Sequence, residues 1–114
     1  MRKKSISAPF EVLVCIVERG VGDKVNEILN VHDCPFHITT LGEGTAASET
    51  ADIFGFGIVE REVIWALVDP IMSTKILKTL NDVLELEKPR KGIALTIPAN
   101  AASNLMLDVL GINY

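Results

Sequence analysis

Long hydrophobic runs are absent from this chain of 114 residues. Its longest unbroken apolar runs, VLVCIV (residues 12–17) and VIWALV (residues 63–68), contain six residues each. A helix that spans a membrane needs about 20. A basic stretch at residues 2–4 precedes an apolar region, but charged residues interrupt that region and no small-residue cleavage site follows. We therefore expect a cytoplasmic protein that is not inserted in a membrane.

Cysteine and positive charge are also scarce. The two cysteines, Cys15 and Cys34, do not make a disulfide framework. The net charge of −4 leaves no basic stripe that could bind nucleic acid by releasing counterions. A hydrophobic fraction of 48% is typical of a globular chain, and the length is that of one domain. We place this domain at residues 10–114, after an N-terminal extension of residues 1–9.

The glycine-rich segment LGEGTAASETADIFGFG (residues 41–57) lacks cations. No lysine or arginine occurs between residues 41 and 60, whereas a P-loop needs a lysine that reaches the phosphates. A dinucleotide-binding fingerprint is also missing, because GEGTAA has alanine where the third glycine belongs. Gly42 and Gly44 still let backbone approach a ligand closely. This segment is a candidate lid or intersubunit arm.

An internal repeat appears when the chain is shifted by 51 positions. The segment EVLVCIVERGVGDKVNEIL (residues 11–29) then lies over EVIWALVDPIMSTKILKTL (residues 62–80). Each copy begins as a strand rich in β-branched residues and continues with helical spacing. Ser73 or Thr74 is a plausible cap of the second helix. The expected apolar stripes are Val21, Val25, Ile28 and Leu29 in the first helix, and Ile76, Leu77, Leu80, Val83 and Leu84 in the second.

A further strand follows each helix, at FHITTLG (residues 36–42) and GIALTIP (residues 92–98). The resulting βαββαβ order predicts a ferredoxin-like α+β domain, a four-stranded antiparallel sheet with two helices on one face. In the tail, Ala101, Leu105, Met106 and Val109 have helical spacing and predict a short C-terminal helix. The two six-residue apolar runs do not alternate with polar residues, although two helices cover only one face of a sheet. Copies of the chain are the simplest cover for the other face, so we predict a homo-oligomer.

Basic residues gather in EKPRKG, where Lys88, Arg90 and Lys91 precede the last strand. They form either an anion site together with glycine backbone or a solvated basic turn, which is common after a helix. Within one subunit this loop and the glycine-rich loop need not lie at the same end of the sheet. In a cyclic oligomer the two loops can still meet.

Metal and catalytic motifs are weak. HDCPFH brings together His32, Cys34 and His37, but a structural zinc site usually has four ligands in a recognised spacing. We therefore predict no metal site. No combination of nucleophile, base and orienting residue has a defensible spacing, so no catalytic residue is assigned and no enzymatic activity is expected.

Over residues 10–99 the sequence resembles the PII-like signalling proteins, through the duplicated βαβ unit, the long loop opened by GEG and the stretch KPRKGIALTIP. GTAASE and RKGIALTIP are similar to a less characterised branch of this superfamily. The resemblance implies a homotrimer that binds AMP, ADP or ATP between subunits. It also implies that residues 43–59 form a T-loop that contacts a transporter or enzyme. The implied ligand-binding residues are Gly42, Gly44, Lys88, Arg90, Lys91 and Gly92.

The chain also differs from typical PII-like proteins. Lys91 and Gly92 stand in the reverse of the usual order, and no arginine follows the last strand. No tyrosine lies in residues 43–59, so uridylylation is not expected. Two alternatives remain. One is a metal-binding trimer that resembles the divalent-cation tolerance proteins; the other is a small acylphosphatase-like hydrolase that depends on Arg90, with only Arg19 after its first strand.

Overall fold

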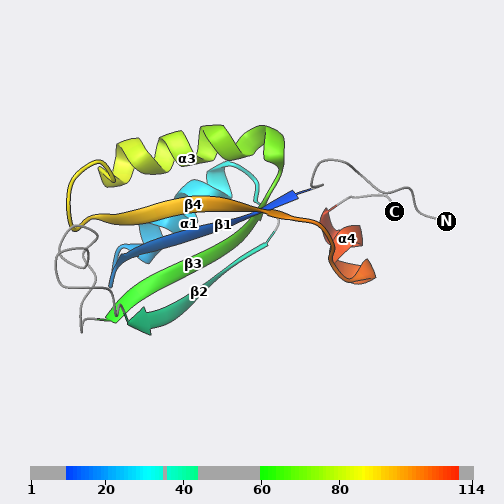
Figure 1. Cartoon of the computed structure of the whole chain (residues 1–114), viewed down its shortest axis with the longest axis horizontal. Helices are drawn as coiled ribbons and strands as arrows, with labels where there is room; N and C mark the ends of the chain where they lie inside the picture. Colours follow the sequence, from blue (N-terminus) through cyan, green and yellow to red (C-terminus); the bar gives the residue numbers. More distant parts are fainter. Residues whose placement is uncertain (1–9, 35, 44–59, 111–114) are drawn as a thin grey trace.

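The computed structural model of the chain describes residues 10–34, 36–43 and 60–110. Its elements are, in chain order, β1 (Phe10–Glu18), α1 (Gly22–Val31), β2 (Phe36–Glu43), β3 (Glu60–Val68), α3 (Pro70–Leu84), β4 (Gly92–Ala99) and α4 (Asn104–Leu110). The strands form one antiparallel sheet in the order β2-β3-β1-β4, with α1 and α3 on one side of it (Figure 1). The predicted ferredoxin-like α+β fold is confirmed.

The two repeat copies are interleaved in this sheet. Their strands, β1 and β3, are the central pair, and the register aligns Leu13 with Ala66 and Cys15 with Ile64. β2 and β4 are the edge strands. The central strands supply half of the buried core residues, and the edge strands supply none of them, which explains why the apolar runs of the sequence are longest in β1 and β3.

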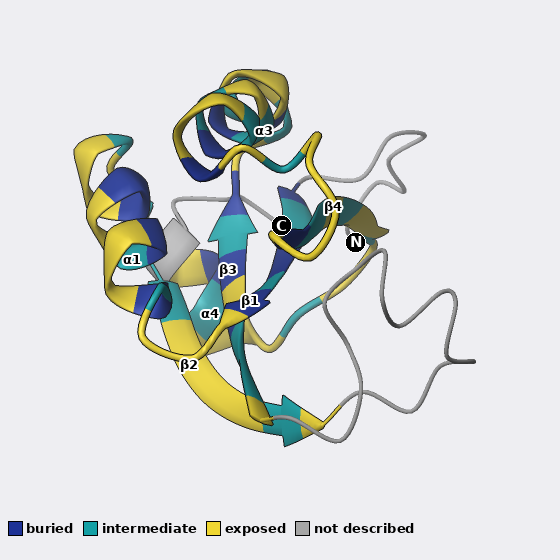
Figure 2. Ribbon diagram, turned by 90° about the vertical axis from the view of Figure 1, so that its left-hand side faces the viewer, coloured by how far each residue is buried: buried dark blue, intermediate teal, exposed yellow. Residues whose placement is uncertain are grey.

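One core lies between the sheet and the two helices. Every second residue of β1 enters it, namely Leu13, Cys15 and Val17, while α1 contributes the predicted Val25, Ile28 and Leu29. In Figure 2 the buried parts of α1 and α3 face the sheet, and exposed residues cover their outer sides. Burying these side chains supplies about 25 cal/mol per Å² of apolar surface, the main contribution to the stability of the fold.

The start of α3 differs from the prediction. Asp69 is its N-cap, with its side chain accepting a hydrogen bond from the backbone N–H of Ile71 at 2.9 Å, and Pro70 occupies the first turn. Ser73, one of the two expected caps, is buried inside the helix and donates to the carbonyl of Pro70. Thr74 also lies within α3, so both cap predictions were wrong. The dipeptide Asp-Pro is a recognised helix-start signal that outranks an internal Ser or Thr.

Three of the apolar positions predicted for the helices also differ. In α3 the stripe is formed by Ile76, Leu80 and Leu84 with Leu77 beside them, whereas Val83 is 46% exposed. The C-terminal helix α4 is present, but Leu107, which the predicted stripe did not include, is buried, and Leu105 is 75% exposed. Ala101 lies before the helix begins. Short helices have few turns, so a one-residue change of phase selects a different stripe.

The sheet face that points away from α1 and α3 is apolar. Register places on it Val14 and Ile16 of β1, Trp65 of β3 and Leu95 of β4. Trp65 is 41% and Leu95 40% exposed. Large exposed apolar patches usually mark an interaction surface. The lack of alternation seen in the sequence therefore corresponds to a second apolar face in the structure.

Within the residues that the structure describes, no helix is long and apolar enough to cross a membrane. The proposed N-terminal extension (residues 1–9), Gly44 and the rest of the glycine-rich loop up to residue 59 lie outside the described residues.

Candidate functional site

Three chain segments gather at one end of the sheet: the β1–α1 turn, the strand ends that flank residues 44–59, and the α3–β4 connection (Figure 1). Strand register defines this end, because Gly42 pairs with Arg61, Arg61 with Glu18, and the neighbouring Val17 with Gly92. The glycine-rich and basic loops therefore leave the same end of a single subunit. They leave from opposite edges, however, separated by three strand spacings or about 14 Å.

The α3–β4 connection has a tightly determined backbone. Glu85 and Arg90 adopt left-handed conformations (φ 55° and 69°), and Gly92 has φ 125°. A Cβ atom on Gly92 would collide with the carbonyl oxygen of Ile16 in β1. Gly92 is therefore required where β4 joins the sheet. The close contact with β1 therefore explains why position 92 is a glycine, a residue that the sequence resemblance had marked for ligand binding.

Lys88 is engaged by a neighbour. Its Nζ lies 2.6 Å from Glu85 Oε1, and its backbone N–H donates to the Glu85 carbonyl. The hydrogen bond and the opposite charge raise the pKa of Lys88 and lower the pKa of Glu85, to which the charge of Lys91 also contributes. Both side chains are largely exposed, so the pair adds little stability. Its effect on a site is to reduce the charge that Lys88 can offer a ligand.

A cavity of about 530 Å³ opens beside this connection. Arg90 and Lys91 line it from the α3–β4 side, and the β1–α1 turn closes the other side with Lys24 of α1. Its remaining lining residues are Glu18, Gly20, Val21, Val83, Leu84, Glu85 and Pro89. Ligand pockets usually have volumes of about 300–1,000 Å³. The cavity joins two of the expected site residues to a segment that the sequence analysis had not selected.

The charges in this cavity do not balance. Among the described residues Lys24, Arg90 and Lys91 have no ion-pair partner within 4 Å. Glu85 also lines the cavity, but Lys88 already pairs with it. With Lys88 counted, four cations face two carboxylates, Glu18 and Glu85, and Val21, Val83, Leu84 and Pro89 supply an apolar wall. The cavity therefore suits an anion that carries an apolar group.

The β1–α1 turn is fixed by β3. Glu62 Oε1 accepts hydrogen bonds from the backbone N–H groups of Gly20 (3.0 Å) and Gly22 (2.7 Å). Val21, the N-cap residue, makes no side-chain capping bond, so this carboxylate satisfies the start of α1. Arg19 pairs with Glu60 at 2.7 Å. Both connections run to the first residues of β3, directly after residues 44–59.

Both histidines of the HDCPFH segment make hydrogen bonds to neighbouring groups. His37 of β2 points to α1, where its Nδ1 lies 2.9 Å from Asn26 Oδ1 and its Nε2 2.9 Å from Asn30 Oδ1. His32 Nδ1 lies 2.9 Å from the Ile28 carbonyl oxygen. In the described part of the chain no three His, Cys, Asp or Glu side chains are placed to hold a metal ion. Both ring nitrogens of His37 are therefore occupied by asparagine side chains in this arrangement.

The two arginines of the hydrolase alternative have different surroundings. Arg19 is bound to Glu60 and does not line the cavity, whereas Arg90 belongs to a different loop.

Lys24 and the β1–α1 turn carry no recognised phosphate-binding motif, so local sequence alone did not mark them. Topology was the available signal. In a βαββαβ sheet the chain alternates between the two ends, which places the β1–α1 turn beside the start of β4.

The sequence matches no protein-family model and no curated protein sequence. Solved structures with the same fold include CPII bound to ADP, AMP and acetate, from Thiomonas intermedia K12, with a TM-score of 0.65 and 13% identity over 86% of this chain and 93% of that one. The GlnK–ATP complex of B. subtilis has a TM-score of 0.64 and 14% identity over 90% and 92% of the two chains. A DUF3240 family protein from Shewanella baltica has a TM-score of 0.65 and 12% identity, over 85% and 97%. The chain therefore has a PII-like fold.

Proposed function

We propose that this protein is a cytoplasmic, homotrimeric PII-like regulator rather than an enzyme, and that it binds a small organic anion, an adenine nucleotide. Residues 43–59 would respond to the ligand and contact a transporter or enzyme. The observation that carries this proposal is the cavity with its excess of cations, which lies at the same sheet end as the strand ends flanking residues 44–59.

The shape and lining of the cavity favour a nucleotide over an inorganic ion. Arg90 and Lys91 offer charge-assisted hydrogen bonds to phosphate oxygens, while Val21 and Pro89 offer apolar surface to a base or sugar. The similar folds of CPII with ADP and AMP and of GlnK with ATP support this ligand class. The proposed binding residues are Gly42, Gly44, Lys88, Arg90, Lys91 and Gly92.

The apolar sheet face supports the trimer. Packing three such faces together would remove Trp65 and Leu95 from water and bring an edge strand of one subunit near that of the next. Gly42 of one subunit could then approach the basic loop of its neighbour. Within one subunit the two are separated by about 14 Å, which prevents such an approach.

Thermal unfolding with AMP, ADP and ATP, followed by titration calorimetry, tests the ligand. A ligand at 100 times its Kd stabilises the folded state by about 2.7 kcal/mol, equivalent to about 10 °C for a domain of this size. Arg90→Gly is a suited variant, because glycine accepts the left-handed backbone at this position while the guanidinium is removed. We expect Arg90→Gly to remain folded and to lose most of the shift. If no nucleotide at millimolar concentration moves the wild-type Tm and calorimetry is flat, the nucleotide proposal is wrong.

A further inference from the structure

The β1–α1 turn forms one side of the cavity and presents Lys24 to it from the first turn of α1. Lys24 reaches the same space as Arg90 and Lys91, although 66 positions separate it from Arg90 in the sequence. It has no ion pair among the described residues. We propose that Lys24 is a third phosphate-binding cation of this site, that the site's charge comes from one subunit, and that Glu62 is the residue that positions Lys24. This inference rests on the proposed anion-binding function.

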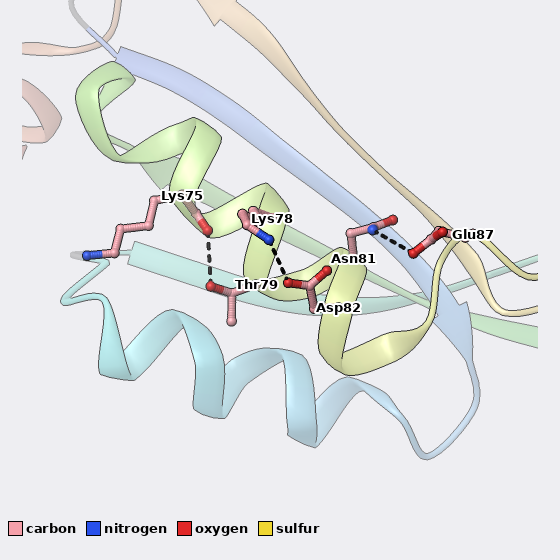
Figure 3. Close-up of polar contacts among 6 residues, drawn as sticks. All are labelled: Lys75, Lys78, Thr79, Asn81, Asp82 and Glu87. Atoms are coloured by element: carbon pink, nitrogen blue, oxygen red, sulfur yellow. Dashed lines mark hydrogen bonds and ion pairs between the residues drawn. The ribbon is translucent and has the colours of Figure 1, made fainter.

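Two other lysines of the chain differ from Lys24 because they already have a carboxylate partner. On α3, Lys78 Nζ lies 3.0 Å from Asp82 Oδ2, four residues later (Figure 3), and Lys78 is not among the residues that line the cavity. Lys88 is similarly bound to Glu85. A cation that already has a carboxylate partner gains little from a phosphate. Lys24, Arg90 and Lys91 have no such partner within the described residues, and these are the cations that line the cavity.

Glu62 fixes the position of Lys24 through the turn that precedes it. Its Oε1 accepts from both Gly20 N and Gly22 N, the two backbone groups that bracket the turn before Lys24. The fit is close, since a Cβ on Gly22 would lie 2.6 Å from Glu62 Oε1. Without this acceptor the start of α1 would have two unsatisfied N–H groups and no side-chain cap. The turn, and with it the Lys24 side chain, would then lose its fixed position against Arg90.

Lys24→Gln tests the charge, with Lys78→Gln as the matched control on the neighbouring helix. Calorimetry with ADP and with adenosine separates phosphate contacts from contacts to the base and sugar. We expect Lys24→Gln to weaken ADP binding about tenfold, as the loss of one charge-assisted contact does, and to leave adenosine binding unchanged. Lys78→Gln should alter neither.

Glu62 is tested by a double-mutant cycle. Glu62→Gln keeps an acceptor oxygen and should bind ADP as the wild type does, whereas Glu62→Ala should bind about five- to tenfold more weakly. In the Lys24→Gln background Glu62→Ala should cost no further affinity, because its effect acts through Lys24. A purely structural role of Glu62 would lower the Tm but show no such dependence on Lys24.

The outcomes separate the two proposals. If the wild type binds ADP and Lys24→Gln binds it equally well, the role of Lys24 is refuted and the proposed function stands. Additive losses in the cycle refute the positioning role of Glu62. If the wild type binds no adenine nucleotide, the proposed function fails and this inference fails with it.

Discussion

Gly92 is the residue for which the structure predicts the largest effect of adding one methyl group. Gly92→Ala would place a Cβ against the Ile16 carbonyl oxygen and within 3.3 Å of Val17 Cα. Both contacts are with the backbone of β1, which pairs with β4 from this point. Backbone in a paired central strand cannot move aside as a flexible side chain can. The variant must therefore move the start of β4 and with it the basic connection.

Two contributions set the size of the effect. A non-glycine residue at φ 125° costs about 1–3 kcal/mol in strain. Overpacking adds about 1–3 kcal/mol. We expect Gly92→Ala to lower the free energy of unfolding by about 3 kcal/mol, and the Tm by about 12 °C.

Two other glycines separate these contributions. Gly20 has φ 96° and no atom within 4 Å of an added Cβ, so Gly20→Ala tests backbone strain alone and should cost about 1 kcal/mol. Gly42→Ala tests a close contact alone, because its Cβ would lie 3.3 Å from the Val63 Cγ2 methyl, and should change stability by less than about 0.5 kcal/mol. Urea unfolding at one fixed protein concentration measures all three, since the stability of an oligomer depends on concentration. A Gly92→Ala variant within 1 kcal/mol of the wild type would refute the steric argument.

Two further effects follow from local chemistry. Burial raises the pKa of the Cys15 thiol to about 12. Above the usual pKa near 9 the unfolded chain loses this proton first, so Cys15 should lower stability by up to about 1.4 kcal/mol per pH unit between pH 9 and 12. In urea titrations the slope of the wild type should exceed the slope of Cys15→Ala by about this amount, because Cys34, whose pKa is also raised, contributes to both. Asp69→Ala removes the cap of Ile71 N and should cost about 1 kcal/mol in thermal unfolding, whereas Asp69→Asn should cost a few tenths.

The sequence predicted what depends on local periodicity. The apolar runs identified β1 and β3, the helical stripes identified α1 and α3, and the 51-residue repeat indicated the βαββαβ order. These features are strongly determined because each element must bury one face in a shared core. In α4, which has only seven residues, the pattern predicted the helix but did not select Leu107, which is buried.

The contacts that shape the site were not predictable in this way. Glu62 meets Gly20 and Gly22 across about 40 positions of sequence, and no local spacing marks such a pair. Lys24 lines a cavity with Arg90 and Lys91 only because β4 returns beside β1. The basic connection itself was visible as EKPRKG, but its partners depend on topology.

The internal repeat also shows where the two halves have diverged. Glu62 and Glu11 are equivalent under the 51-residue shift, as are Gly20 and Ile71. The first half has its turn bound by a residue of the second half, because Glu62 accepts a hydrogen bond from Gly20 N. In the second half the equivalent Ile71 N–H donates to Asp69, a residue of the same half. The described residues leave Glu11 Oε1 buried and without a hydrogen-bond partner. The second half thus uses its own local cap, and only the first half ties its turn to the neighbouring strand, at the end of the sheet where the cavity lies.

The apolar sheet face gives a prediction about assembly. Leu95 pairs with Val14 and lies on the face away from the helices, 40% exposed in one subunit. If that face stays in water, Leu95→Lys should change stability by less than about 0.5 kcal/mol. If copies of the chain cover it, the variant buries an unpaired charge, at a cost of several kcal/mol per subunit, and should dissociate the assembly. Ile71→Lys is the control, since Ile71 is 86% exposed on α3.

Light scattering at micromolar concentration distinguishes these cases. We expect the wild type and Ile71→Lys to have about three times the 12.4 kDa mass of one chain, and Leu95→Lys to have a mass near that of one chain. A trimeric Leu95→Lys with an unchanged Tm would place the interface elsewhere. A wild type of one-chain mass would show that the apolar face is not covered by copies of this chain, and the approach of Gly42 to a neighbour's basic loop would be excluded. The cavity formed by Lys24, Arg90 and Lys91 would remain, because all three belong to one subunit.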